Sequence, residues 1–208
     1  MPSVNFRLLL VTDRTQTSGR SLPSLIRQAV GAGLPAIQLR ERDLSTKDLL
    51  SLAQEIQAVT TPHAVPLIIN DRVDLMLALN LDGVHLRSDS VPPVPVRRLI
   101  GSRRLIGIST HSAEDVRCAN QGGADYVVFG PIFDTPSKRA FGSPLGLELL
   151  AEVCRQSALP VFAIGGITSD RVREVRRAGA HGVAVIGALL THDDIGAAVR
   201  AFMQTLDA

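Results

Sequence analysis

Short apolar runs alternate with amphipathic stretches along the whole chain. Each run is rich in Val, Ile and Leu and ends at a polar residue or a glycine, and the stretch that follows has apolar residues at helical spacing. Runs without polar alternation are typical of parallel strands that helices cover. The expected strands are residues 6–13, 35–43, 66–71, 83–86, 105–110 and 125–133, with the last two inside 160–170 and 181–190.

Several of the expected helices begin with recognisable capping signals. Ser45 and Ser112 each have an aspartate three residues later, which is the spacing of a capping box. Residues 143–144 read Ser-Pro, an N-cap followed by proline at the first helical position. The last two helices are expected to begin near residues 169–170 and at Thr191.

Eight strands, each followed by a helix, predict an α/β fold that closes into a (β/α)₈ TIM barrel. We expect one such domain over residues 1–208. An open doubly wound sheet is the alternative, but it would more often carry a glycine fingerprint after the first strand. Residues 11–20, VTDRTQTSGR, contain no such fingerprint.

The last two predicted strands both end in small residues. Gly165 and Gly166 follow one strand, and Gly187 and Ala188 follow the other, each just before a helix. Glycine lets a ligand approach the backbone closely, and unpaired N–H groups at a helix start favour an anion. One Gly-Gly pair alone would more simply make a tight turn. Two such ends in succession predict a phosphate-binding cup.

In a barrel, the polar residues at the carboxyl ends of the strands gather at one rim. Many donors and cations beside a phosphate cup suit a substrate with more than one anionic or polar group. The residues expected at this rim are Asp13, Gln38, Arg40, Arg42, Asn70, Asp71, His85, Arg87, Ser109, His111, Thr135, Ser137 and Lys138.

Charge and composition argue against several other functions. The formal net charge is +2 with scattered Lys and Arg, so neither nucleic acid nor a membrane surface is expected as a partner. No apolar run reaches membrane-spanning length and no signal peptide is recognisable, so we expect a cytoplasmic protein. Cys118 and Cys154 lack neighbours at metal-binding spacing. The oligomeric state stays open, and a homo-oligomer is compatible with the sequence.

Eight segments carry a resemblance that covers nearly the whole chain. They are QLRERD, INDRVDLMLA, DGVHL, GISTHS, ADYVVFGPIFDTPSK, PLGLELL, FAIGGI and AGAHGVAVIGALL. In this order they resemble the thiamin phosphate synthase and TenI superfamily of thiamin-biosynthetic barrels. The resemblance implies an enzyme that acts on a thiazole phosphate. A synthase couples it to a pyrimidine diphosphate with Mg²⁺ and releases pyrophosphate, whereas a TenI-type tautomerase aromatises a thiazole phosphate carboxylate.

The resemblance also assigns roles to the rim residues. It implies that Gln38 contacts the aminopyrimidine, through an amide that can both donate and accept. Arg42 stands where a lysine is usual, which keeps the charge and changes the hydrogen-bond geometry. The thiazole phosphate matches Gly165, Gly166, Gly187 and Ala188; the pyrophosphate cage matches Arg40, Arg42, Asn70 and Lys138; and Ser109, Thr135 and Ser137 join the substrate-binding set.

The metal site departs from the family pattern. Asp71 matches one Mg²⁺ carboxylate, but this chain reads HLRSDS where the synthases read HLGQED. Ser90 therefore stands in the place of the second carboxylate, and Arg87 replaces a glycine. Mg²⁺ is usually held by carboxylates together with substrate phosphates, and a nearby cation would disfavour it. Asp89 would replace Ser90 only if the loop were rebuilt.

His111 matches the histidine proposed as acid and base in TenI-type tautomerases. An imidazole with a pKa of about 6.5 can take and return a proton near neutral pH, as a tautomerisation requires. Synthases commonly have a histidine there too, so His111 alone does not separate the two reactions.

Three hypotheses follow. The leading one is a thiazole tautomerase with catalytic His111 and no cofactor, because the metal pair is broken. The alternative is a thiamin phosphate synthase that uses Mg²⁺ at Asp71, which Gln38 and the intact cationic cage favour. The third is a non-catalytic binder of thiazole phosphate or thiamin phosphate, for which the sequence offers no exposed apolar stripe. In each case the expected partners are small molecules: thiazole phosphate and, for the synthase, a pyrimidine diphosphate.

Overall fold

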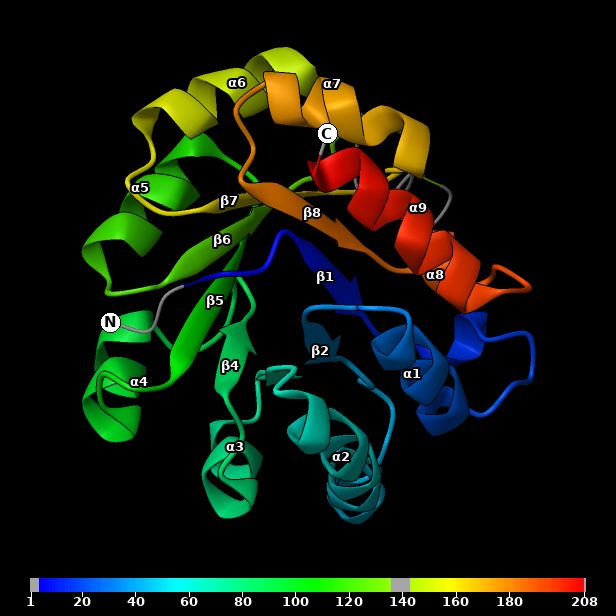
Figure 1. The fold of residues 1–208 in the computed structure, drawn as a ribbon. Helices are drawn as coiled ribbons and strands as arrows, with labels where there is room; N and C mark the ends of the chain where they lie inside the picture. Colours follow the sequence, from blue (N-terminus) through cyan, green and yellow to red (C-terminus); the bar gives the residue numbers. More distant parts are fainter. Residues whose placement is uncertain (1–3, 136–142, 208) are drawn as a thin grey trace.

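The computed structural model describes residues 4–135 and 143–207. Its strands are parallel and form one closed barrel in which β8 pairs with β1 (Figure 1). The predicted (β/α)₈ barrel is confirmed, and the extent of the domain over 1–208 stays a prediction. The strands are β1 Leu8–Val11, β2 Ile37–Leu39, β3 Leu67–Asn70, β4 Gly83–Leu86, β5 Leu105–Thr110, β6 Tyr126–Phe129, β7 Val161–Ile164 and β8 Gly182–Val185.

Helices form a ring around the strands, and α9 lies beside α1 where the ring closes (Figure 1). Across the described ranges, none of them is long and apolar enough to cross a membrane. The α-helices are α1 Leu22–Gly31, α2 Thr46–Thr60, α3 Val73–Leu79, α4 Pro93–Ile100, α5 Ala113–Gln121, α6 Gly146–Gln156, α7 Val172–Arg177, α8 Gly187–Leu190 and α9 Ile195–Asp207, and the short 3₁₀ helices are η1 Arg14–Gln16, η2 Thr61–His63 and η4 Ser169–Arg171.

The strands have a buried layer on each face. Successive side chains of a strand point to opposite faces. In β1, Leu8 and Leu10 therefore join the layer between the strands and the helices, while Leu9 and Val11 join the layer inside the barrel. Large side chains such as Tyr126 fill that interior. Because the interior is packed, a ligand site is confined to the mouth of the barrel.

Two strands are shorter than the apolar pattern predicts. We expected residues 35–43 to be extended, but β2 ends at Leu39, after which the Arg40 N–H donates to the Thr12 hydroxyl and not to a backbone carbonyl of the neighbouring strand. We also expected a strand over 125–133, but β6 ends at Phe129. Proline at 131 has no N–H with which to continue the ladder.

Two helices, α2 and α5, begin where the sequence predicted, directly after Ser45 and Ser112. Ser112 accepts a hydrogen bond from the N–H of Asp115, and the Asp115 carboxylate accepts one from the N–H of Ser112, which completes the predicted capping box of α5. Ser45 accepts from the N–H of Asp48 in the same way. There the Asp48 carboxylate takes the Ser45 hydroxyl instead of a backbone donor, so only half of the box forms.

The starts of the helices after β6 and β8 were predicted wrongly. Helix α6 begins at Gly146 and not after the Ser-Pro pair at 143–144, because the N–H groups of Leu145 and Gly146 bond to carbonyls of residues 131 and 132. After β8, the short helix α8 occupies residues expected to belong to the strand end. The next helix, α9, begins at Ile195, four residues after the predicted start at Thr191.

Candidate active site

The mouth of the barrel brings together side chains from β2 and β3. Gln38 is only 3% exposed, and its Nε2 donates a hydrogen bond to Oδ1 of Asn70 over 3.1 Å. These two strands are adjacent in the barrel, so the two amides lie at neighbouring strand ends. The Asn70 side-chain carbonyl is engaged by this bond, and its amide nitrogen is a hydrogen-bond donor. The two predicted binding residues therefore act as one unit.

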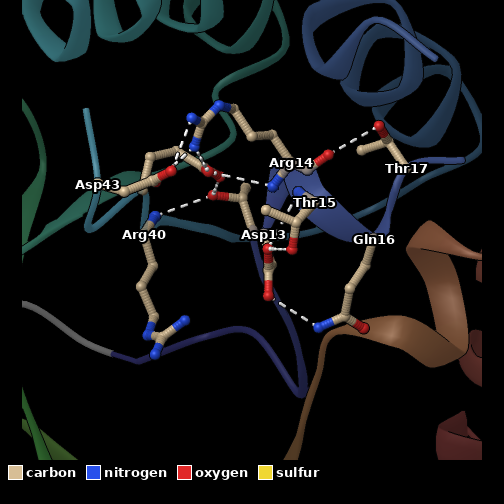
Figure 2. Close-up of polar contacts among 9 residues, drawn as sticks. Asp13, Arg14, Thr15, Gln16, Thr17, Arg40 and Asp43 are labelled. Atoms are coloured by element: carbon tan, nitrogen blue, oxygen red, sulfur yellow. Dashed lines mark hydrogen bonds and ion pairs between the residues drawn. The ribbon is translucent and has the colours of Figure 1, made fainter. Parts of the chain in front are cut away.

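Arg40 follows Gln38 by two residues and is half-buried at the same rim. Its backbone N–H donates to the Thr12 hydroxyl over 2.9 Å, and its guanidinium points away from the neighbouring Arg14–Asp43 pair (Figure 2). Burial lowers the pKa of Arg40, and the nearby charge of Arg42 lowers it further. Both causes disfavour the charged guanidinium, so a bound anion would stabilise it. An arginine still stays charged near neutral pH, so Arg40 is suited to hold a phosphate group.

The cup residues lie side by side at the ends of β7 and β8, which are paired in the barrel. Gly165 and Gly166 have φ angles of 100° and 64°, in the region that favours glycine. A Cβ on Gly166 would lie 2.6 Å from the carbonyl oxygen of Asp134. The N–H groups of Gly187 and Ala188 are the first two of α8, so they have no partner in that helix. This geometry fits the predicted anion cup, and phosphate binding there stays a prediction.

Asp71 has an unusual environment at the end of β3. It is not a glycine, yet its φ is 64°, and its N–H donates to the carbonyl of His85 over 2.9 Å. Its Oδ1 atom is buried and has no hydrogen-bond partner among the described residues. Its Oδ2 atom lies 3.8 Å from Nε of Arg87. A buried carboxylate oxygen without a partner is costly unless a ligand supplies one.

Arg87 lies between two carboxylates. Its Nε and Nη2 donate to the two oxygens of Asp89 over 2.8 and 2.7 Å, while Asp71 lies on its other side. Hydrogen bonds from Arg87 lower the pKa of Asp89. The Asp89 side chain is 71% exposed and engaged by the arginine, so it does not take the place of the missing carboxylate at Ser90. The described part of the chain contains no group of three acidic, His or Cys residues that could hold a metal ion.

His111 lies at the end of β5 with its ring held at one nitrogen. Nδ1 lies 2.6 Å from the carbonyl oxygen of Gly130. A carbonyl oxygen can only accept, so Nδ1 is the donor, and in the neutral form of the ring the lone pair is on Nε2. The N–H of His111 donates to Asp115, the residue of the α5 capping box. This arrangement provides a positioned base, and a catalytic role for it stays a prediction.

Comparison with known proteins identifies the family. The sequence pattern described as thiamine monophosphate synthase matches residues 8–189. A putative thiamine-phosphate synthase of Geobacter sulfurreducens is 42% identical over 206 residues, which cover 99% of this chain and 97% of the relative. The chain belongs to the thiamine monophosphate synthase family. The resemblance to the thiamin phosphate synthase and TenI superfamily is therefore confirmed, and with it the expectation of a thiamin-biosynthetic enzyme.

Other relatives agree with this assignment. The thiamine-phosphate synthase of Clostridium novyi is 40% identical over 197 residues, covering 95% of this chain and 97% of the relative. Among solved structures, the thiamine phosphate pyrophosphorylase of Pyrococcus furiosus superimposes with a TM-score of 0.88 at 30% identity, covering 97% of this chain and 95% of the other. These names favour the synthase alternative over the tautomerase.

Sequence reasoning missed a buried carboxylate in this family member. Glu41 is 6% exposed, and it accepts hydrogen bonds from the Thr12 hydroxyl over 2.6 Å and from the N–H of Arg14 over 3.1 Å. Arg14 also forms two hydrogen bonds to Asp43. The only signal was a glutamate between two arginines directly after a strand, and such a charged run usually faces solvent. The network joins the ends of β1 and β2 and so fixes the position of the backbone at Arg40.

Asp13 also has a structural role at this rim. Burial alone would raise the pKa of Asp13, but hydrogen bonds from Thr15 and Gln16 outweigh burial and lower it. Figure 2 shows the Asp13 side chain turned toward these two residues. A Cβ on Gly187 would lie 2.8 Å from Oε1 of Gln16. The turn after β1 therefore packs directly against the cup at β8.

Ser137 and Lys138 lie outside the described residues, and Thr135 is the last described residue before them. A hollow of about 610 Å³ occurs near the start of β1, lined by Arg7, Thr205, Leu206, Asp207 and three arginines of α7. It shares no residue with the mouth. We assign the candidate active site to the mouth because the predicted residues converge there.

Proposed function

We propose that this protein is a thiamin phosphate synthase, which joins a hydroxymethylpyrimidine diphosphate to a thiazole phosphate and releases pyrophosphate. The observation that carries the proposal is the buried Oδ1 of Asp71, which has no partner in the part of the chain that the structure describes and lies beside a rim of arginines. A carboxylate with a free oxygen next to several cations suits a diphosphate and its counter-ion. The names of the relatives at about 40% identity support the same reaction.

The chain's own residues would divide the work as follows. Gln38 holds the pyrimidine, because its second amide N–H and its carbonyl offer a donor and an acceptor at positions that Asn70 fixes, while Asn70 belongs to the diphosphate cage. Arg40 and Arg42 hold the diphosphate and stabilise the negative charge that grows as pyrophosphate leaves. The cup at Gly166 and Gly187 holds the thiazole phosphate by backbone N–H groups. The thiazole nitrogen then attacks the electron-poor pyrimidine methylene carbon, and the new C–N bond replaces the C–O bond.

Asp71 would hold Mg²⁺, which supplies positive charge to the diphosphate when it is bound. One protein carboxylate is enough for such a site when substrate phosphates provide further oxygens. The partnerless Oδ1 of Asp71 fits that role. Nε of Arg87 lies 3.8 Å from Oδ2 of Asp71. Arg87 would therefore add a fixed positive charge beside the metal site, in which the family pattern has a second carboxylate.

The tautomerase is the second candidate, and one observation favours it. The free Nε2 of His111 is a positioned base at the mouth. A tautomerase needs such a base, but it needs neither the arginine-rich rim nor the free oxygen of Asp71. We therefore rank it below the synthase.

The purified protein can be tested with both sets of substrates. We expect pyrophosphate release only when pyrimidine diphosphate and thiazole phosphate are both present with Mg²⁺, in step with formation of thiamin phosphate. Incubation with the thiazole phosphate carboxylate alone should leave its ring unchanged. Aromatisation of that carboxylate without any coupling would overturn the proposal in favour of the tautomerase.

A further inference from the structure

A glycine in β5 creates a contact across the inside of the barrel. His85 in β4 and Tyr126 in β6 are both aligned with Gly107 in the strand between them. A Cβ on Gly107 would lie 2.4 Å from the Tyr126 hydroxyl and 2.5 Å from Nδ1 of His85. Since glycine has no side chain, the two rings meet across the intervening strand.

A hydrogen-bonded chain runs from this contact to the mouth. The Tyr126 hydroxyl lies 3.3 Å from Nδ1 of His85, and Nε2 of the same ring lies 2.9 Å from the Ser109 hydroxyl oxygen. Tyr126 is fully buried and His85 is 1% exposed, whereas Ser109 is half-buried at the rim. The chain therefore joins the packed interior to a residue that a ligand can reach.

The direction of each hydrogen bond follows from counting protons. His85 is 1% exposed and both of its ring nitrogens face hydroxyl groups rather than a carboxylate, so burial favours the neutral ring, which carries one proton. Burial also raises the pKa of Tyr126, so its hydroxyl keeps its proton. Within the described residues, that hydroxyl has no other acceptor than Nδ1 of His85. If Nδ1 were the donor instead, the buried Tyr126 proton would be left without an acceptor, which is costly.

We propose that Tyr126 and His85 are positioning residues that turn the Ser109 hydroxyl into a hydrogen-bond donor for the bound substrate. Tyr126 donates to Nδ1, which leaves the proton of the ring on Nε2. Nε2–H then donates to the Ser109 oxygen. A serine hydroxyl that accepts from the protein directs its own proton elsewhere, and here that proton faces the mouth. Ser109 is thus set to recognise an acceptor atom, such as a phosphate oxygen or a ring nitrogen.

The aromatic packing around Tyr126 keeps the start of this chain in place. The Tyr126 ring packs edge-on against Phe6 and Phe162, with centroids 5.9 and 5.5 Å away. Such pairs fix the orientation of a ring. This gives a matched control, because Phe162→Leu loosens the same cluster while the Tyr126 hydroxyl is kept.

The tautomer of His85 can be measured without any substrate. In long-range ¹H–¹⁵N spectra of ¹⁵N-histidine-labelled protein, we expect His85 to be protonated at Nε2 only. Tyr126→Phe removes the donor to Nδ1, so the Nδ1–H form should appear in that variant, while Phe162→Leu should keep the Nε2–H form. A wild-type ring protonated at Nδ1 would overturn the proposal, whatever reaction the protein catalyses.

The effect on substrate is measured by a double-mutant cycle, and this part rests on the proposed synthase function. Loss of one oriented hydrogen bond should lower kcat/KM by about 3- to 10-fold in Tyr126→Phe. Ser109→Ala should lower it by at least as much, and the double variant should be no worse than Ser109→Ala alone. If the fold-losses in kcat/KM of the two single variants multiply in the double variant, Tyr126 acts independently of Ser109 through general packing, and the proposal is overturned. If the wild type does not couple the substrates, only the function has failed, and the spectra still test the orientation of the chain.

Discussion

At the scale of single residues, Gly166 is needed for both its conformation and its size. Its φ is 64°, and a side chain there would run into the Asp134 carbonyl. Gly166→Ala should therefore weaken thiazole phosphate binding more than tenfold and cost roughly 1–3 kcal/mol of folding stability. Calorimetry with thiazole phosphate and thermal melting measure the two effects.

Gly101 provides the control for that substitution. Its φ is 72°, but nothing lies within 4 Å of where its Cβ would be. Gly101→Ala should lower stability through the backbone alone and leave phosphate binding unchanged. Equal binding losses in the two variants would show that the cup at Gly166 is assigned wrongly.

Arg87 should oppose metal binding at Asp71. Its Nε lies 3.8 Å from the Asp71 carboxylate, and removal of this positive charge makes the site more favourable for a divalent cation. With pyrimidine diphosphate present, Arg87→Ala should bind Mg²⁺ roughly 2- to 5-fold more tightly, as expected for a partly exposed charge pair. Calorimetric titration measures this affinity. In Arg72→Ala, which removes a neighbouring arginine that pairs with Asp74, the affinity should not change. Unchanged or weaker binding in Arg87→Ala would contradict this account.

At the scale of elements, the two capping signals differ in strength. Ser112 begins a complete capping box on α5, whereas the box at Ser45 on α2 is only half formed. Ser112→Ala should therefore cost about 1 kcal/mol of unfolding free energy, and Ser45→Ala should cost less. Urea denaturation of both variants checks the order. A larger loss for Ser45→Ala would mean that the missing backbone bond is unimportant.

Element boundaries were the weakest part of the sequence prediction, for a physical reason. The presence and order of the strands followed from local apolar runs. The start of α6 did not, because Leu145 bonds to the carbonyl of Pro131, a contact between segments 14 positions apart that no local pattern encodes. The apolar run at 187–190, expected at the end of the last strand, forms the short helix α8.

At the scale of the whole molecule, the fold could be predicted from the sequence, while the hydrogen bonds inside the mouth of the barrel could not. Residue spacing placed Gln38 and Asn70 on one rim, but their hydrogen bond depends on barrel closure. The buried Glu41 and the Tyr126–His85–Ser109 chain also arise only when strands become neighbours. His85, which the sequence placed at the rim, is buried between two hydroxyl groups.

The buried His85 should make the stability of the molecule depend on pH. Its folded pKa is about 3, well below that of an unfolded histidine. Between about pH 6.5 and 3 the unfolded chain binds a proton there that the folded protein does not, so stability is lost as the pH falls, by up to about 1.4 kcal/mol per pH unit. Urea unfolding at pH 7, 6 and 5 gives the free energy of unfolding at each pH. The slope of this free energy against pH should correspond to one fewer proton taken up on unfolding in His85→Gln than in the wild type. The same slope in both proteins would contradict the neutral, buried state of His85.

The proposed synthase expels pyrophosphate and does not move a proton on a thiazole. The most direct test compares kcat/KM for thiamin phosphate formation in Asp71→Asn and His111→Asn, with folding checked by circular dichroism. Asp71→Asn keeps the shape and loses the charge, and it should lower kcat/KM by roughly 10²-fold or more because charge on the leaving group governs the barrier. His111→Asn should stay within about tenfold of wild type, since no proton transfer by the imidazole is required. The opposite ranking, with Asp71→Asn nearly as active as wild type and His111→Asn inactive, would contradict the synthase account.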